Sequence, residues 1–205
     1  LAINFHSDAE PEYPAVIANE SPIEFLTKLR FGQPGVPDMP SGIDNSWKPQ
    51  DYADVIAYIV TLPTSSPVTE GGRIYDNWMG ATGATAPESD QPLWATQKTN
   101  KLTGADTWAC SSCHGFDYKG KDGVNAQGTD NYTGFVGVLA DKDKSADQLL
   151  AALTGKTDPK HDFSKHLTAP ELDALVAFMQ KGVVDKAPYI NANQTAKGDA
   201  THGKK

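Results

Sequence analysis

Two segments in the first third of the chain carry apolar residues at helical spacing between residues that start and stop helices. Ser21-Pro22-Ile23-Glu24 has the form of a capping box with proline at the first helical position, and Gly32 ends the helix it predicts. Pro49 starts a second helix, with apolar residues at 52, 55, 56 and 59, and Pro63 ends it. Residues 1–20 show little periodicity and contain two prolines, so we expect an irregular lead-in.

A second pair of helices with the same features is predicted later in the chain. Ser145-Ala146-Asp147-Gln148 is another capping box, and Gly155 ends the helix that follows it. Thr168-Ala169-Pro170-Glu171 caps a last helix, with apolar residues at 172, 175, 176, 178 and 179. Because no alternation of strands and helices accompanies these four segments, the pattern predicts an all-α fold.

The two helix pairs form an internal repeat. The sequence Val-Ile-Ala-Tyr-Ile at 55–59 matches Leu-Val-Ala-Phe-Met at 175–179. The offset is 124 residues between Ser21 and Ser145, and 120 between Ala57 and Ala177. The later copy is therefore shorter by four residues between those points, and positions in one copy can be mapped onto the other.

Charge and hydropathy narrow the class of protein. The 205 residues carry a net charge of −8, and residues 1–62 alone hold nine acidic and three basic side chains. This balance argues against binding to nucleic acid and suits docking on a basic partner surface, although it also serves solubility. No run of about 18 apolar residues exists, so no membrane span is predicted. The first residues lack a signal peptide's basic start and long apolar run, which leads us to expect a mature or trimmed form.

The only two cysteines stand in Cys110-Ser111-Ser112-Cys113-His114, which has the spacing of a c-type haem attachment motif. On one helical turn the two thiols can add to the haem vinyl groups from the same side, leaving His114 beneath the iron as proximal ligand. A redox dithiol, an isolated disulfide or chance are the alternatives. A thioredoxin-like dithiol would need a βαβ setting, which the pattern lacks.

These residues resemble the cytochrome c family. Gly72-Arg73-Ile74-Tyr75 resembles its N-terminal helix, Cys110 to Gly115 its haem motif, and 170–181 its C-terminal helix. Gly32 to Pro40 resembles the loop in which that family presents a methionine as distal iron ligand. The resemblance implies a helical domain around one covalent haem c. The insertion of residues 80–107 before the motif departs from the family, and we expect it to be a surface loop over one haem edge.

The resemblance and the repeat together predict the domain organisation. Residues 1–62 correspond to the C-terminal half of a cytochrome c-like domain that lacks its Cys-x-x-Cys-His motif, and 63–68 form a linker. Residues 69–190 form a complete domain with the 80–107 insertion, and 191–205 resemble the start of a further domain. We expect the chain to come from a larger tandem-domain protein, and residues 1–62 not to fold alone.

The repeat also suggests the distal ligand. Met39 maps to positions 159–163, where there is no methionine but there is His161. We therefore predict His114 and His161 as the two iron ligands, with a lower potential than a histidine–methionine pair would give. His166 is the alternative. Met39 could serve only a haem bound upstream or on another chain, or else is an unused remnant.

A few other side chains are candidates for the iron site or for the core around it. Met79 is a weak ligand candidate, and Met179 is interpreted as core. Trp108, Phe116 and Tyr118 flank the motif and would wall the haem, or form ordinary core.

An iron with two strong protein ligands has no open site, so we expect electron transfer as a module of a multi-haem cytochrome, with no catalytic residue. Redox partner proteins or neighbouring haem domains are the expected partners, in an oligomer or larger complex. A redox enzyme resembling the dihaem thiosulfate- or peroxide-type cytochromes is one alternative, and an assembly module of a filament or complex is another. The resemblance implies a periplasmic or extracellular location.

The first prediction concerns the loaded chain. Its intact mass should exceed that of the polypeptide by one haem, and near-infrared magnetic circular dichroism should show the charge-transfer band of two histidine ligands. A methionine-type band would contradict the assignment of His161. A high-spin spectrum would indicate an open iron and favour the enzyme alternative.

Overall fold

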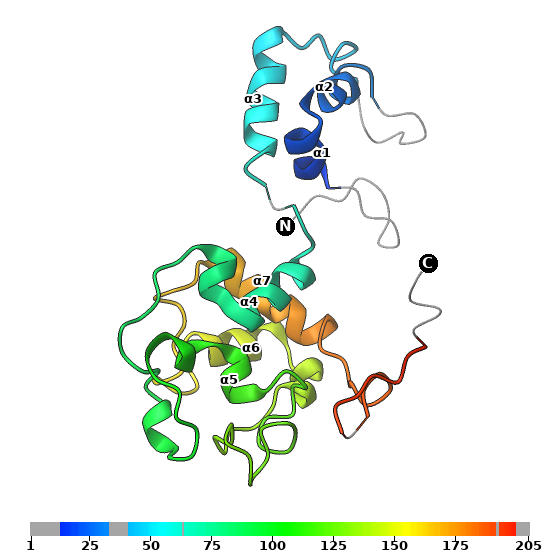
Figure 1. Ribbon diagram of the computed structural model, residues 1–205. Coiled ribbons are helices and arrows are strands. Elements are labelled where there is room, and N and C mark those ends of the chain that lie inside the picture. The colour runs from blue at the N-terminus through cyan, green and yellow to red at the C-terminus, as the bar shows by residue number, and fades with distance from the viewer. Residues whose placement is uncertain (1–12, 33–40, 63, 192, 200–205) are drawn as a thin grey trace. The chain divides into compact units, whose positions relative to one another are not determined.

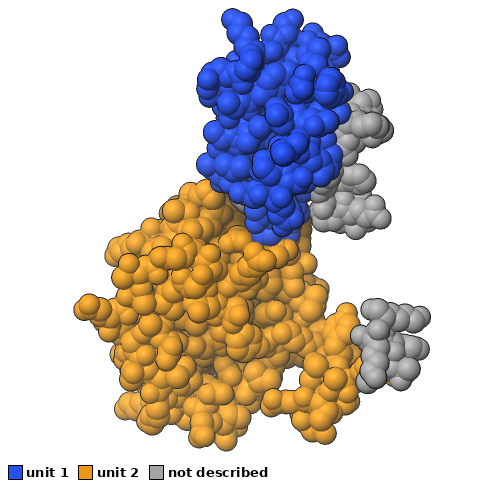
Figure 2. Space-filling view, turned by 45° about the horizontal axis from the view of Figure 1, so that its top comes forward, with its two compact units in different colours: residues 1–66 blue, residues 67–205 orange. Residues whose placement is uncertain are grey.

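The computed structural model describes residues 13–32, 41–62, 64–191 and 193–199 (Figure 1). Regular structure in these residues is helical, and extended pairing is limited to three isolated β-bridges, which confirms the all-α fold class. The chain divides between Ser66 and Pro67 into two compact units (Figure 2). This boundary lies inside the predicted linker, residues 63–68.

Unit 1 contains three described helices around a small core of its own. They are α1 (Pro14–Glu20), α2 (Pro22–Phe31) and α3 (Pro49–Ile59). The buried core residues are Ala18, Phe25, Leu29, Tyr52 and Ile59. The starts of α2 and α3 confirm the sequence prediction. The irregular lead-in was wrong for residues 14–20, because Pro14 stands at the first helical position, where its missing N–H is not needed.

The capping box predicted at Ser21 does not form. Ser21 ends α1 as well as preceding α2, and its backbone N–H donates to the carbonyl of Ile17 at 2.8 Å. The Ser21 N–H is therefore not free to donate to the Glu24 carboxylate. That carboxylate instead pairs with the Lys28 ammonium at 3.2 Å. The capping-box pattern failed because the preceding helix, α1, already uses the Ser21 N–H.

Unit 2 contains the remaining described helices. They are α4 (Pro67–Thr82), η1 (Trp94–Thr96), η2 (Gly104–Trp108), α5 (Cys110–His114), η3 (Leu139–Asp143), α6 (Ala146–Leu153) and α7 (Ala169–Lys181). Both predicted capping boxes are present. The backbone N–H of Ser145 donates to Gln148 Oε1 at 2.9 Å, and that of Thr168 to Glu171 Oε2 at 2.6 Å.

The scaffold of unit 2 is the crossing of α4 and α7, which lie side by side in Figure 1. The helix backbones are in close contact at Gly71, where an added Cβ would collide with the backbone carbonyl of Ala174. Ile74 and Trp78 of α4 and Leu175 of α7 belong to one core cluster, and all are at most 2% exposed. This packing fixes the orientation of α4, which contacts the helical turn that carries the two cysteines.

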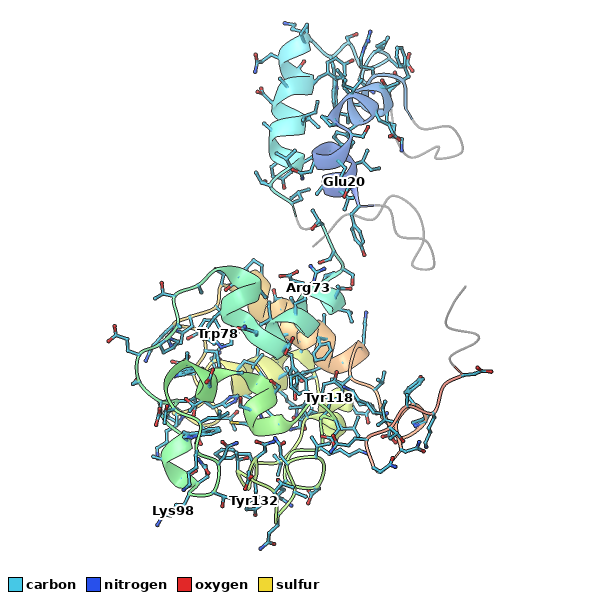
Figure 3. The ribbon with its side chains drawn as sticks, viewed as in Figure 1. Glu20, Arg73, Trp78, Lys98, Tyr118 and Tyr132 are labelled. Carbon is cyan, nitrogen blue, oxygen red and sulfur yellow. The ribbon has the colours of Figure 1, made fainter. Side chains whose placement is uncertain are left out.

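Residues 80–107 form a hydrogen-bonded segment with a buried anchor. Its first three residues, 80–82, complete α4. Trp94 is 4% exposed, and its Nε1 donates to the carbonyl of Leu102 at 2.9 Å. Figure 3 shows Lys98 at the outer end of the segment. The expected surface loop is therefore in part a packed element.

The second prediction follows from the α4–α7 crossing. Gly71→Ala should lower the free energy of unfolding by about 1–3 kcal/mol, because the helices must separate to admit the methyl group. Gly80→Ala, beyond the kink that the non-helical backbone of Asn77 makes in α4, is the control, since its Cβ would meet only the side chain of Asn77, at 3.1 Å. The control should change stability by less than about 1 kcal/mol. Equal effects in denaturant unfolding would contradict this account.

Candidate functional site

α5 is a single helical turn that carries both cysteines and His114. It ends at Gly115, whose φ of 75° lies in the left-handed region that favours glycine. Two bonds hold it against α4: Tyr75 Oη donates to the carbonyl of Gly115 at 2.7 Å, and Ser111 Oγ to that of Asp76 at 3.4 Å. The core of the unit therefore fixes the orientation of this short turn.

Both thiols and His114 line a cleft in unit 2. The enclosed space of the cleft is about 150 Å³, and its mouth is open to solvent. Most of its lining is apolar and comes from α6, α7, the 80–107 segment and the residues that follow or connect these elements, including Leu93, Trp108, Val138, Leu149, Leu153, Phe163, Leu175 and Met179.

His161 lies opposite His114 in this cleft. Their ring centres are 6.2 Å apart and the ring planes are inclined at 80°. A transition metal binds an imidazole nitrogen at about 2 Å, and the ring centre lies about 1 Å behind it, so two imidazoles across one ion have centres about 6 Å apart. The observed separation fits two ligands of a single metal ion.

Both imidazoles are tied to the backbone through the same nitrogen. His114 Nδ1 donates to the carbonyl of Val136 at 2.6 Å, and His161 Nδ1 to that of Ala152 at 2.9 Å. A carbonyl only accepts, so Nδ1 carries the proton and Nε2 of the neutral ring keeps a lone pair. This is the usual arrangement of metal-binding histidines, whose other nitrogen is held by a carbonyl or carboxylate.

The segment after α6 forms a tight turn that carries His161. The backbone N–H of His161 donates to the carbonyl of Asp158 at 2.8 Å, and the N–H of Phe163 donates to the carbonyl of Leu153 at 2.9 Å. Thr154 and Asp162 form an isolated β-bridge across the turn. Phe163 then packs against the His161 ring, with the ring centres 5.1 Å apart. These contacts direct His161 into the cleft.

Gln91, from the 80–107 segment, is a part of the site that the sequence did not predict. It is 3% exposed and lines the cleft. Its Nε2 donates to the carbonyl of Lys160 at 2.7 Å, and its Oε1 accepts from the N–H of Leu93 at 2.6 Å. No motif signals this role, because Gln91 and Lys160 are 69 residues apart in the chain.

The alternative ligand His166 lies elsewhere. Its ring centre is 4.8 Å from that of Trp108 and 5.5 Å from that of Trp78, and it does not line the cleft. Met79 also packs against the core without reaching the lining, and Met39 lies outside the described residues. The structure therefore brings His161, and not His166, opposite His114.

Of the aromatic residues that flank the motif, only Trp108 lines the cleft. The expectation that Phe116 walls the site or joins the core was wrong, since its side chain is 56% exposed. Tyr118 packs against Tyr75 and Phe178, with ring centres 5.3 and 5.8 Å away, and does not line the cleft. Met179, expected in the core, is 6% exposed and also lines the cleft.

Burial sets the protonation of the three motif side chains. It raises the pKa of both the Cys110 and Cys113 thiols to about 12, so both are neutral at physiological pH. It lowers the pKa of His114 below its usual value, and the hydrogen bond to Val136 opposes this shift without reversing it. His114 is thus a neutral imidazole in the folded protein.

Comparison of the chain with protein-family models, curated proteins and solved structures gave no match. Among the described residues, no three or more His, Cys, Asp or Glu side chains are grouped to hold a bare metal ion. A haem iron needs only two protein ligands, because the macrocycle supplies the others. None of the helices described combines the length and apolar composition that crossing a bilayer requires.

The third prediction is a loss of stability in mild acid. The unfolded chain binds a proton at His114 near pH 6.5, but the folded protein binds it only at lower pH. Stability from the neutral ring is therefore complete above about pH 6.5 and declines as pH falls toward the folded pKa. Urea unfolding between about pH 7.5 and 5.5 should show a steeper decline than in His114→Gln. Identical slopes would contradict the buried neutral state.

Proposed function

We propose that unit 2 holds one haem c, attached through Cys110 and Cys113 and ligated by His114 and His161, and that it transfers electrons. The observation that carries the proposal is the pair of imidazoles, with ring centres 6.2 Å apart, in the same cleft as the two thiols of the Cys-x-x-Cys-His motif. Either feature alone would fit more than one kind of site. Together they supply both covalent anchors and both axial ligands of a single group.

The residues present fit this cofactor. Both cysteines are free and line the cleft, so both thiols are available for thioether bonds. The mainly apolar walls match the faces of a porphyrin, and burying that surface would strengthen the core of the unit. Haem c supplies one-electron redox chemistry at its iron.

The protein's own residues favour electron transfer over catalysis. His114 and His161 would occupy both axial positions, so neither face is open to a substrate. The Nδ1 bonds to Val136 and Ala152 hold each ring in place and increase the basicity of Nε2. Phe163 and Leu153 line the cleft with His161, and their apolar side chains would limit the access of water to it. Compared with a methionine thioether, a second imidazole stabilises ferric iron and lowers the potential.

The wider setting of the proposal comes from the resemblance to the cytochrome c family. That resemblance favours a module of a multi-haem cytochrome in the periplasm or outside the cell. Redox partner proteins or neighbouring haem domains would then donate and accept its electrons.

The fourth prediction tests the ligand pair with a matched control. His161→Ala should convert the loaded protein from low-spin to high-spin iron and allow carbon monoxide to bind, because one axial position is opened. His161→Met should raise the potential by on the order of 0.1 V, within the roughly 0.8 V that axial ligation spans.

His166→Ala is the control, since it removes a histidine from the same segment that packs on Trp108 instead of lining the cleft. Its spectrum and potential should match the parent protein. If His166→Ala became high-spin while His161→Ala did not, the ligand assignment would be overturned. A parent protein without covalent haem would overturn the proposed function itself.

A further inference from the structure

We infer that Gln91 is a positioning residue for His161, and that the 80–107 segment acts through it as a clamp that keeps the distal side of the cleft closed. The inference rests on the proposed function, because it concerns one of the proposed ligands. It assigns a role to a segment that the resemblance leaves unexplained.

The first step of the argument is the burial of Gln91. A buried amide is costly unless its polar atoms find partners, and Gln91 is only 3% exposed. Its side chain has two partners: Nε2 donates to the Lys160 carbonyl and Oε1 accepts from the Leu93 N–H. Its backbone N–H donates to Thr107 Oγ1 at 2.8 Å. The residue is thus fixed at three points.

The second step is the position of Gln91 between the turn that carries His161 and another part of the cleft wall. The Lys160 carbonyl belongs to the peptide bond that leads directly into His161. On the other side, Leu93 lines the cleft and Thr107 directly precedes Trp108, which also lines it. Gln91 therefore connects two parts of the protein. One is the turn that carries His161, and the other is the cleft wall formed by the 80–107 segment. Moving that turn outward would break the bond to Lys160.

The third step concerns what else restrains the turn. The ring of His161 is bonded to the carbonyl of Ala152, in the helix α6 that directly precedes the turn. If α6 and the turn moved together, this bond would stay intact. The bonds from His161 to Asp158 and from Phe163 to Leu153 are likewise local. Phe163 also packs on Trp108, with ring centres 5.8 Å apart. The Gln91 bond adds a directional hydrogen bond between the turn and a distant segment. It would therefore oppose dissociation of His161 from the iron by holding the backbone next to His161.

Gln97 offers a matched control in the same segment. Its Nε2 donates to the carbonyl of Asn100 at 2.9 Å, and its Oε1 accepts from the N–H of the same residue at 2.9 Å. It therefore has the same chemistry as Gln91, an amide that bridges a backbone carbonyl and a backbone N–H. These bonds stay within the segment and do not reach residues 154–163.

The experiment compares Gln91→Met and Gln97→Met in the haem-loaded chain. Methionine is unbranched, adapts to the space of glutamine and removes both side-chain hydrogen bonds. The readout is the rate of carbon monoxide binding to the reduced protein, which is limited by transient dissociation of His161. We expect an increase of about 10- to 100-fold for Gln91→Met, in line with the loss of a buried hydrogen bond. The rate for Gln97→Met should stay within about twofold of the parent, since its bonds are remote from His161.

Thermal unfolding of both variants separates positioning from general stability. If both variants lose similar stability but only Gln91→Met binds carbon monoxide faster, the clamp is supported. If Gln91→Met binds at the parent rate, or Gln97→Met shows the same increase, the inference is overturned. Should Gln91→Met not load haem, Gln91→Asn replaces it, because its amide is too short to reach Leu93 and Lys160 together. It should show a smaller increase, and the parent rate would again overturn the clamp.

The parent protein is measured first, so that the two possible failures are distinguishable. Absence of covalent haem, or an open iron in the parent, would overturn the proposed function and this inference with it. A parent with two histidine ligands and a Gln91 variant of unchanged rate would overturn only the clamp.

Discussion

The arrangement of His114 and His161 across an apolar cleft is the constraint on which the rest of unit 2 depends. The two imidazoles have centres 6.2 Å apart, and both are held by backbone carbonyls. The surrounding helices can be understood as the means of keeping that separation. α5 is too short to hold its own orientation, so α4 holds it through Tyr75 and the cleft-facing core.

Each histidine is anchored at a different level of the structure. His114 belongs to a turn packed on the α4–α7 crossing, where Gly71 allows the helix backbones to meet. His161 belongs to a turn after α6, which is stabilised mainly by its own local bonds and by Phe163. Such locally stabilised turns open more readily than a helix crossing. The contact from Gln91 then compensates on the side where the proposed ligand is less firmly held.

Local physics explains which predictions from the sequence were confirmed. Capping at Ser145 and Thr168 depends on residues three apart, so the pattern contains nearly all of the information. The capping box at Ser21 failed for a reason outside that window, because α1 uses the Ser21 N–H first. The helix at 14–20 was missed since two prolines and weak periodicity concealed a start at Pro14.

By itself the sequence determined the all-α class, the starts of four helices and the motif Cys110–His114, because each depends on neighbours along the chain. The internal repeat favoured His161, inside the window 159–163, over His166, just outside it, as the predicted second ligand. Only the tertiary structure placed His161 opposite His114 and His166 against Trp108. It also brought Gln91 to Lys160 across 69 residues, since packing and not sequence spacing determines which distant groups meet.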